Sequence, residues 1–583
     1  MWKLRSPHST PRKGESDKGS RRSATNSSKR DKTVTVTDVA TGIESSLSKE
    51  QEDAGLSIVA DRVELLKGLL QEDGREAAAL VDHPAMPLLC QKLSPVVVST
   101  IPHLCFIFKC IAELETENSL STVTGFLRAV TNVHLDRQGE LSLVGLLLCT
   151  VSASGTVVAA STADCLFNGK DIPLLDLLLN CVHSETVGSS ARSGLLQMIG
   201  IMNQCSRLEQ AIIDSSFCTI IASGLGAQYN QLVQSTTEFT EEKGTRSPQF
   251  REALDNVLEY LVFWQNSLAQ SDSQKLNEKL LAYFDVLFVR QLLYPSIQLV
   301  SKTDKRLGPM LIGFRRVLSH VTNSPQVNSN GAEQELATVI LSYYTDHDAI
   351  RQSHQTASEL SDLVGPETPK LRPLIEYYLE AQDDPVVITV TLQIASIVVT
   401  SWSPTDCRAN ESSSQLAKLV QQLAKIRGAL DAEGDIGEYE QDIQRTLLSD
   451  QWNKGVLKTL QFGSLKRKLL SMMQTFYTND PAVNLALTEV VRDLALKSIS
   501  WLPSVIPIIE DLCKTYREFC TDSFRNDIQK LMSRIKEQGG LQQQVHTLHD
   551  PKYANVVILR EFVKELEALV VCRMWLPLTT KQG

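Results

Sequence analysis

The chain has 583 residues, of which 42% are hydrophobic and only 6% aromatic, and its formal net charge at pH 7 is -10. Glycine and proline are a little scarce, at 29 and 21 residues, which favours helices over turn-rich β architectures. The negative charge argues against a nucleic-acid-binding protein, because affinity for a phosphate backbone needs a concentrated positive face.

Cysteine usage indicates the redox compartment. Twelve cysteines are spread along the chain without a CxxC pair, and Cys105, Cys110 and Cys181 lie inside apolar runs. This pattern favours reduced core thiols in a cytosolic protein over a disulfide framework. We therefore expect a cytoplasmic location.

The first 55 residues are rich in Ser, Thr, Lys and Arg and show no apolar period. Up to Lys32 there are ten Lys or Arg against three Asp or Glu, a local excess of 10 - 3 = +7. Such a segment buries too little apolar surface to offset its ordering entropy, so we predict that residues 1–55 are a disordered basic tail. It contains no apolar core of the length that a secretory signal peptide needs.

A divergent helical region is predicted at 56–168. It begins with a helical face of Val63, Leu66, Leu69 and Leu70. The prolines at 87, 95 and 102 limit any single helix there to a few turns.

Two uncharged runs, at 141–163 and 385–405, have the length that a membrane-spanning helix needs. The first is rich in Ser and Thr and is interpreted as two short buried helices around a Ser-Ala-Ser-Gly turn. The second follows Asp383 and Asp384, and its β-branched residues leave a strand open as an alternative. We expect that neither run crosses a membrane.

Pairs of amphipathic helices are the main pattern of the chain from 169 onward. Within 251–300, apolar residues spaced by three and four form two helical faces on either side of the polar stretch 270–273. The first face contains Leu254, Val257, Leu258, Leu261, Trp264 and Leu268, and the second contains Leu276, Leu280, Phe284, Leu287 and Phe288. The same order of helix, polar turn and helix recurs at 174–201, 374–399 and 469–496.

The turns of the last two pairs carry helix-start signals. Asp384-Pro385 and Asp480-Pro481 place an N-cap residue before a proline at the first helical position. One such pair cannot bury its apolar stripes alone and must stack on its neighbours. We therefore predict an all-α fold, an α-solenoid of degenerate HEAT- or armadillo-like hairpins at 169–583 that ends in a closing helix.

Two charged patches lie between the hairpins at 374–399 and 469–496. The acidic patch consists of Asp431, Glu433, Asp435, Glu438 and Glu440, without a compensating base nearby in sequence, and the basic patch is Lys466-Arg467-Lys468. Each is interpreted as a solvated face, with a docking surface as the alternative.

Catalytic motifs are absent from the sequence. It contains no Gly-rich phosphate loop, GxSxG elbow, HExxH or EF-hand pattern. The nearest approaches to a metal site are Asp346-His347-Asp348 with His354, and His546 with His549 and Asp550. Neither presents a recognisable full ligand set. We expect a protein that is not an enzyme and holds no cofactor or metal.

The C-terminal stretch 555–575 predicts the closing helix. Its apolar stripe consists of Ile558, Leu559, Phe562, Leu566, Leu569 and Val570, with charged residues away from it. Three of these charged residues, Glu561, Lys564 and Glu565, are candidates for contact with a partner.

This stretch resembles the closing motif of the FHF complex subunit HOOK-interacting protein (FHIP) family, of the kind formerly grouped as retinoic acid-induced-like proteins. The positions that match are Leu559, Glu561, Phe562, Lys564, Glu565, Leu566 and Ala568, and those that depart are Arg560, Val563 and Glu567. A weaker resemblance covers roughly 170–575, whereas the first 160 residues match poorly.

The resemblance implies a non-catalytic cargo adaptor. Such an adaptor would link a Hook-type coiled-coil adaptor and the ubiquitin-conjugating-enzyme-like FTS subunit to a Rab GTPase on vesicles or endosomes, and through Hook to dynein and dynactin. Membrane association would be peripheral and only through partners. The alternative is an armadillo- or HEAT-type regulatory scaffold for a kinase, phosphatase or GTPase unrelated to motors.

Overall fold

The computed structural model describes most of the chain, in ranges separated by gaps. These ranges are 34–48, 54–91, 100–131, 133, 135–160, 163–167, 171–236, 247–323, 333–344, 370–380, 384–402, 412–432, 434–448, 462–538 and 551–579. Within them the chain forms 24 α-helices, with short 3-10 and π segments and no strand. The predicted all-α helical solenoid is confirmed, and the strand alternative for 385–405 is wrong because that run contains helix α18 (Pro385–Thr400).

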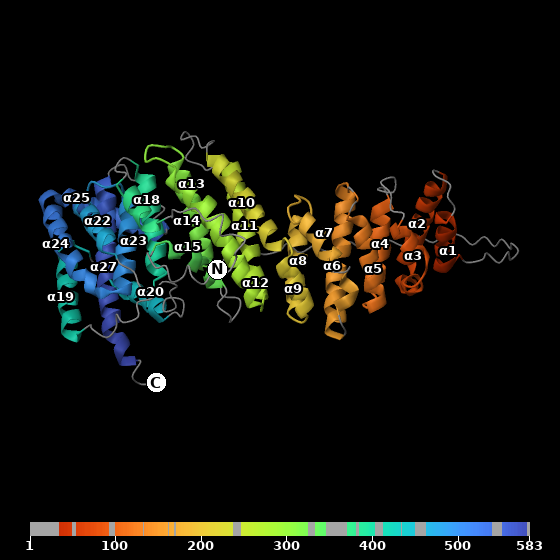
Figure 1. The fold of residues 1–583 in the computed structure, drawn as a ribbon. Helices are drawn as coiled ribbons and strands as arrows, with labels where there is room; N and C mark the ends of the chain where they lie inside the picture. The colour runs from red at the N-terminus through yellow and green to blue at the C-terminus, as the bar shows by residue number, and fades with distance from the viewer. Residues whose placement is uncertain are drawn as a thin grey trace, which may run out of the picture.

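The helices follow one another in a row, so that the molecule is elongated (Figure 1). The first part of the row consists of α1 (Val36–Leu47), α2 (Ala54–Glu72), η1 (Gly74–Leu80), α3 (Ala85–Gln91), α4 (Ile101–Ala112), α5 (Glu117–Val130), α6 (Arg137–Ala160), η3 (Ala163–Leu166), α7 (Pro173–Cys181), α8 (Gly188–Met202) and α9 (Ser206–Asp214). The middle consists of α10 (Phe217–Ser235), α11 (Pro248–Gln270), α12 (Gln274–Tyr283), the π-helix η6 (Phe284–Leu293), α13 (Tyr294–Gln298), α14 (Leu307–Asn323) and α15 (Glu333–Ser342).

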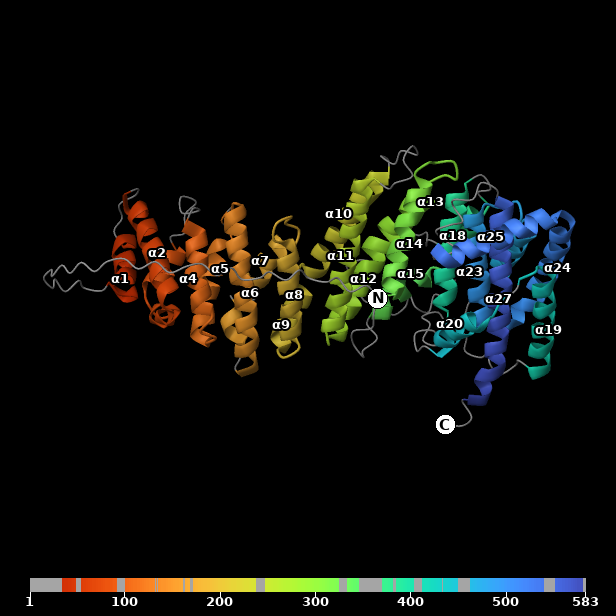
Figure 2. The ribbon, with the colours of Figure 1, turned by 180° about the vertical axis from the view of Figure 1, so that it is seen from behind.

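The C-terminal part is thicker than the rest of the row, because helices surround a central one there (Figure 2). Besides α18, it consists of α17 (Leu371–Tyr378), α19 (Ser413–Ala429), α20 (Gly437–Leu448), α22 (Gly463–Gln474), α23 (Pro481–Lys497), η8 (Ile499–Trp501), α24 (Leu502–Phe519), α25 (Asp522–Gln538) and α27 (Pro551–Thr579). One apolar core runs from Val36 to Cys572 through all these parts.

Both predicted helix caps are present. The Asp384 side chain accepts hydrogen bonds from the backbone N–H groups of Val386 and Val387, at 2.9 and 3.2 Å. Asp480 accepts one from Ala482 at 2.8 Å. These bonds satisfy donors that the first turn of a helix leaves unpaired, and so fix where α18 and α23 begin.

Helix α1 corrects the prediction that residues 1–55 are disordered. Thr35 and Asp38 form a capping box at its start, and Val39 and Ile43 on its inner face are buried against the neighbouring helices. The apolar residues of 36–47 have helical spacing, which the high charge of the residues before them masked. Residues 1–33 lie outside the described ranges.

The run at 141–163 also differs from its prediction. A single 24-residue helix, α6, covers most of it, where two helices and a turn were expected. Two of its hydroxyl groups are satisfied inside the helix, since Thr150 donates to the carbonyl of Leu146 at 2.8 Å and Ser154 to that of Thr150 at 2.6 Å. Ser and Thr therefore did not mark a turn here.

Two helical stretches in the described residues, 137–157 and 274–298, have the length and composition of a membrane span. Helices α9 and α10, which are bent relative to each other, would form a third if the two together made a single span. Half of the first stretch and 67% of the second are buried inside the fold. Helix α18, from the other uncharged run, is shorter than a span, with 16 residues. That neither run crosses a membrane stays a prediction.

Candidate functional site

The closing helix α27 is the centre of the C-terminal part. It packs against α19, α20, α23 and α25, so neighbours cover it on several sides (Figures 1 and 2). Four consecutive residues, Val556 to Leu559, are all buried, which a helix with a single apolar stripe would not allow. The predicted closing helix is present, but it is enclosed, whereas the sequence suggested a cover with a solvated outer face.

The charged side chains of α27 therefore lie among neighbouring helices. Lys564 is only 6% exposed, and its ammonium group lies 3.0 Å from a carboxylate oxygen of Glu561. Glu561 also accepts a hydrogen bond from the Tyr439 hydroxyl on α20. Glu567 pairs with Arg427 on α19 at 2.7 Å. Lys564, a candidate for partner contact, is thus buried and paired within this chain, as a charge removed from water requires.

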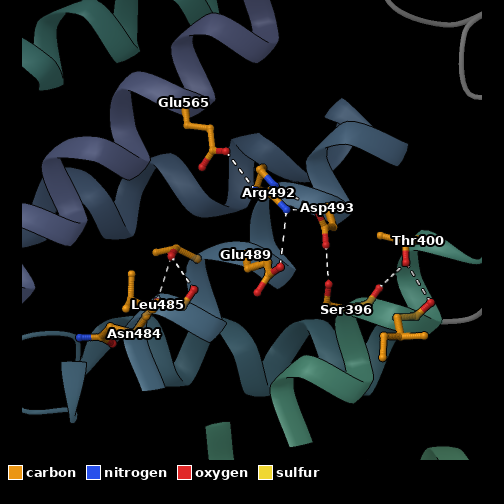
Figure 3. A network of polar contacts seen from close by, with 10 residues as sticks. Ser396, Thr400, Asn484, Leu485, Glu489, Arg492, Asp493 and Glu565 are labelled. Atoms are coloured by element: carbon orange, nitrogen blue, oxygen red, sulfur yellow. Dashed lines mark hydrogen bonds and ion pairs between the residues drawn. The ribbon is translucent and has the colours of Figure 1, made fainter. Parts of the chain in front are cut away.

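Glu565 belongs to a second group of polar residues, which we call the Arg492 network: Ser396, Glu489, Arg492, Asp493 and Glu565 (Figure 3). The Arg492 guanidinium lies 2.7 Å from Asp493, 3.2 Å from Glu565 and 3.9 Å from Glu489. The Ser396 hydroxyl on α18 donates to Asp493 at 2.6 Å. One cation thus holds three carboxylates and links α18, α23 and α27.

The electrostatics of this network follow from its burial. Removal from water raises the pKa of Glu565, an effect that Arg492 opposes. Burial and the nearby Asp493 also raise the pKa of Glu489. On the same helix, burial lowers the pKa of Lys497 to about 8. Burial thus shifts the pKa of ionisable groups on both α23 and α27.

Further polar contacts fix the first half of α27. Arg560 donates to the Tyr516 hydroxyl on α24 at 2.9 Å. The Asn555 side chain donates at 2.9 Å to the carbonyl of Asn479, in the turn before α23. Each of these buried polar groups therefore has a partner from a different element, as a helix with neighbours on several sides requires.

The remaining predicted sites are the two candidate metal sites and the acidic patch. The His and Asp residues considered as metal ligands at 346–354 and 546–550 lie outside the described residues, as does Glu433. Within the described ranges no three potential metal-ligating side chains come together. In the acidic patch, Asp431 has a compensating base after all, since Arg525 lies 2.9 Å away, from 94 positions further along the chain.

Sequence inspection missed a tightly packed cluster between the α7–α8 turn, α10 and α11. The Tyr260 hydroxyl lies 2.7 Å from His183 Nδ1, and the Arg192 guanidinium stacks 4.8 Å from the centre of the Tyr260 ring. Gly224 faces both His183 and Tyr260, and a Cβ atom there would lie 2.8 Å from the tyrosine ring and hydroxyl. Only the bare glycine allows this close approach of the helices.

Gly224→Ala is therefore expected to destabilise the protein by about 1–3 kcal/mol, because the added methyl group overpacks the cluster. Gly200→Ala on α8 is the matched control, since no atom lies within 4 Å of its added Cβ. The control should be neutral or stabilising by up to about 1 kcal/mol, from helix propensity alone. Urea denaturation of both variants tests this, and an equal response would contradict the packing that we describe.

Comparison with known proteins gives a match to a protein family. The family model described as retinoic acid induced 16-like protein matches residues 67–329, from within α2 to just beyond α14. No curated protein matches the chain.

This match corrects the family expectation. The chain is similar to retinoic acid induced 16-like proteins, and the FHIP assignment made from the C-terminal motif is wrong. The matched segment also begins far upstream of 170, where we expected the resemblance to start, and it excludes α27 altogether. Short apolar strings such as that at 559–568 recur in many helices, and so were a weak basis for a family.

Proposed function

We propose that the protein is a non-catalytic cytoplasmic scaffold that binds partner proteins along its helical solenoid. The observation that carries this proposal is the single apolar core that runs from α1 to α27 through an elongated row of helices. Stacked helical hairpins present long continuous surfaces, and proteins of this architecture use them to hold partners. A reducing compartment is consistent with the cysteines, since none of those described is in a disulfide.

The charged residues of the C-terminal core are consistent with this proposal, because they bind one another and not a partner. The Arg492 network and the ion pairs of α27 connect helices within the chain, so partners must use the outer faces. The sequence-based expectation of Hook, FTS and Rab partners depended on a family assignment that has been corrected, and the scaffold proposal does not depend on it.

Affinity purification of the tagged full-length chain from cells tests the proposal. We expect partners in stable, near-stoichiometric amounts, and two surface variants that lose different subsets of them. One variant reverses Glu252 and Asp255 on α11, and the other reverses Asp511 and Lys514 on α24, where all four side chains are exposed. Both should keep the wild-type melting temperature, because exposed charges contribute little to stability.

The identity of the recovered proteins separates the two classes of scaffold. Recovery of Hook-type and FTS proteins, with binding to a GTP-loaded Rab, would support a motor adaptor. Recovery of a kinase, phosphatase or GTPase without them would support a regulatory scaffold. Failure to recover any partner from the folded wild-type protein would contradict the scaffold proposal in both forms.

A further inference from the structure

Three exposed apolar side chains lie along one edge of the solenoid, where the α13–α14 turn meets the start of α18 and the end of α17. Leu299 is 86% exposed, Val386 53% and Tyr377 46%. Side chains of this size are usually covered, and a group of them on one edge marks an interaction surface more often than scattered single residues do. We call these three residues, with the cations around them, the apolar edge.

Contacts between the elements hold the apolar edge together. The Tyr378 hydroxyl donates to the carbonyls of Ile297 and Val300, at 2.8 and 3.1 Å, and so fixes the turn that carries Leu299 against the end of α17. Val386 lies beside the start of α14, where its Cγ1 would be 3.6 Å from a Cβ atom on Gly308. The exposed side chains are therefore presented from fixed backbone positions.

Positive charge surrounds them. The Lys302 ammonium group lies 3.9 Å from the centre of the Tyr377 ring, and Glu380 lies between Lys302 and Lys468. Four cations of the apolar edge pair with its carboxylates: Lys302 and Lys468 with Glu380, Arg306 with Asp304, and Arg372 with Glu376. The other charged residues of this edge are Lys305, Arg467 and Asp384, which caps α18. The local formal charge is 6 - 4 = +2, on a chain whose net charge is -10. This surface complements a negatively charged partner.

We propose that the apolar edge binds directly to an anionic lipid surface. Leu299, Tyr377 and Val386 would enter the headgroup region, and the lysines and arginines around them would contact lipid phosphates. An acidic peptide needs only the cations, and would leave exposed leucine and valine side chains without a role. A tyrosine flanked by lysines beside apolar residues is the composition that a membrane interface favours.

This inference is separate from the scaffold proposal. The sequence analysis expected membrane association only through partners, whereas the apolar edge provides a direct contact that purified protein alone should show.

Vesicle co-sedimentation of the full-length chain is the test. Wild-type protein should bind vesicles that contain phosphatidylserine and should bind poorly to phosphatidylcholine alone. Leu299→Asp should weaken binding about tenfold, because it removes an inserted side chain and adds a charge that the lipid repels. The matched control is Leu448→Asp at the end of α20, which is 65% exposed. It should bind as the wild type does, with both variants keeping the wild-type melting temperature.

Three outcomes would overturn the proposal. The first is that wild-type protein does not bind phosphatidylserine vesicles. The second is equal binding by Leu299→Asp and wild type, since the basic residues before 34 are present in both and would then account for the binding. The third is that a poly-glutamate peptide binds the wild type and vesicles do not, which would assign the apolar edge to an acidic protein partner.

Discussion

Phe562→Ala is expected to lower the free energy of unfolding of the C-terminal part by about 3–5 kcal/mol. Phe562 lies in the middle of α27 and is buried where neighbouring helices enclose it. Removing its ring would leave a cavity that these helices cannot close without losing their own contacts. Urea denaturation followed by circular dichroism measures the change.

The matched control for this variant is Trp575→Ala on the same helix. Trp575 is 63% exposed near the end of α27, so its replacement should change stability by no more than about 0.5 kcal/mol. Similar small effects at both positions would show that the Phe562 face of α27 is not buried.

Arg492→Gln should destabilise the protein as much as Phe562→Ala does, by about 3–5 kcal/mol, but for an electrostatic reason. The change removes the cation from a site that holds Asp493, Glu565 and Glu489, and leaves the buried Asp493 and the half-buried Glu565 without their partner. The control is Arg445→Gln. Arg445 pairs with Asp442 at 2.8 Å, but both side chains are about three-quarters exposed, so the loss there should be under about 1 kcal/mol.

The pH dependence of this variant tests the mechanism. Burial raises the pKa of Glu489 and Glu565 above the usual value of 4.5. Between pH 4.5 and these raised values, the folded state therefore binds more protons than the unfolded state. Their contribution to stability is fully present below about pH 4.5 and declines as the pH rises through the folded-state pKa values. Without Arg492 these values rise further. The stability difference between wild type and Arg492→Gln should therefore be smaller near pH 4.5 than at neutral pH. A difference that does not change with pH would indicate lost packing and not unpaired charge.

The sequence predicted best what depends on neighbouring residues. Asp384 and Asp480 cap helices a few residues away, and the apolar face around Trp264 is set by spacing within one helix. The same local reasoning failed in the middle region, where the second helix of the pair at 251–300 continues as the π-helix η6. There Asp285 and Arg290, five residues apart, form a buried ion pair at 2.8 Å, and Tyr343, in the turn directly after α15, donates to Asp285.

The candidate site could not be predicted because its contacts span long stretches of chain. Glu565 pairs with Arg492, which lies 73 positions away in the sequence, and Glu567 pairs with Arg427, which lies 140 positions away. A charged residue opposite an apolar stripe has the same local pattern whether water or a distant arginine faces it. The local pattern therefore predicts Lys564 and Glu565 as partner-binding candidates, whereas both are paired within the chain. Their burial means that reversing these charges should disturb folding before it disturbs any partner.

Hydrogen exchange of the backbone amides of α27 tests most directly that this helix is the enclosed centre of the C-terminal part. Enclosure by α19, α20 and α23 predicts that amides from 556 to 570 exchange as slowly as those of α23, through unfolding of the whole unit. Phe562→Ala should speed the exchange of both helices together. Exchange of α27 that is much faster than that of α23, and independent of it, would show a helix that only lies on the surface, and would contradict the account.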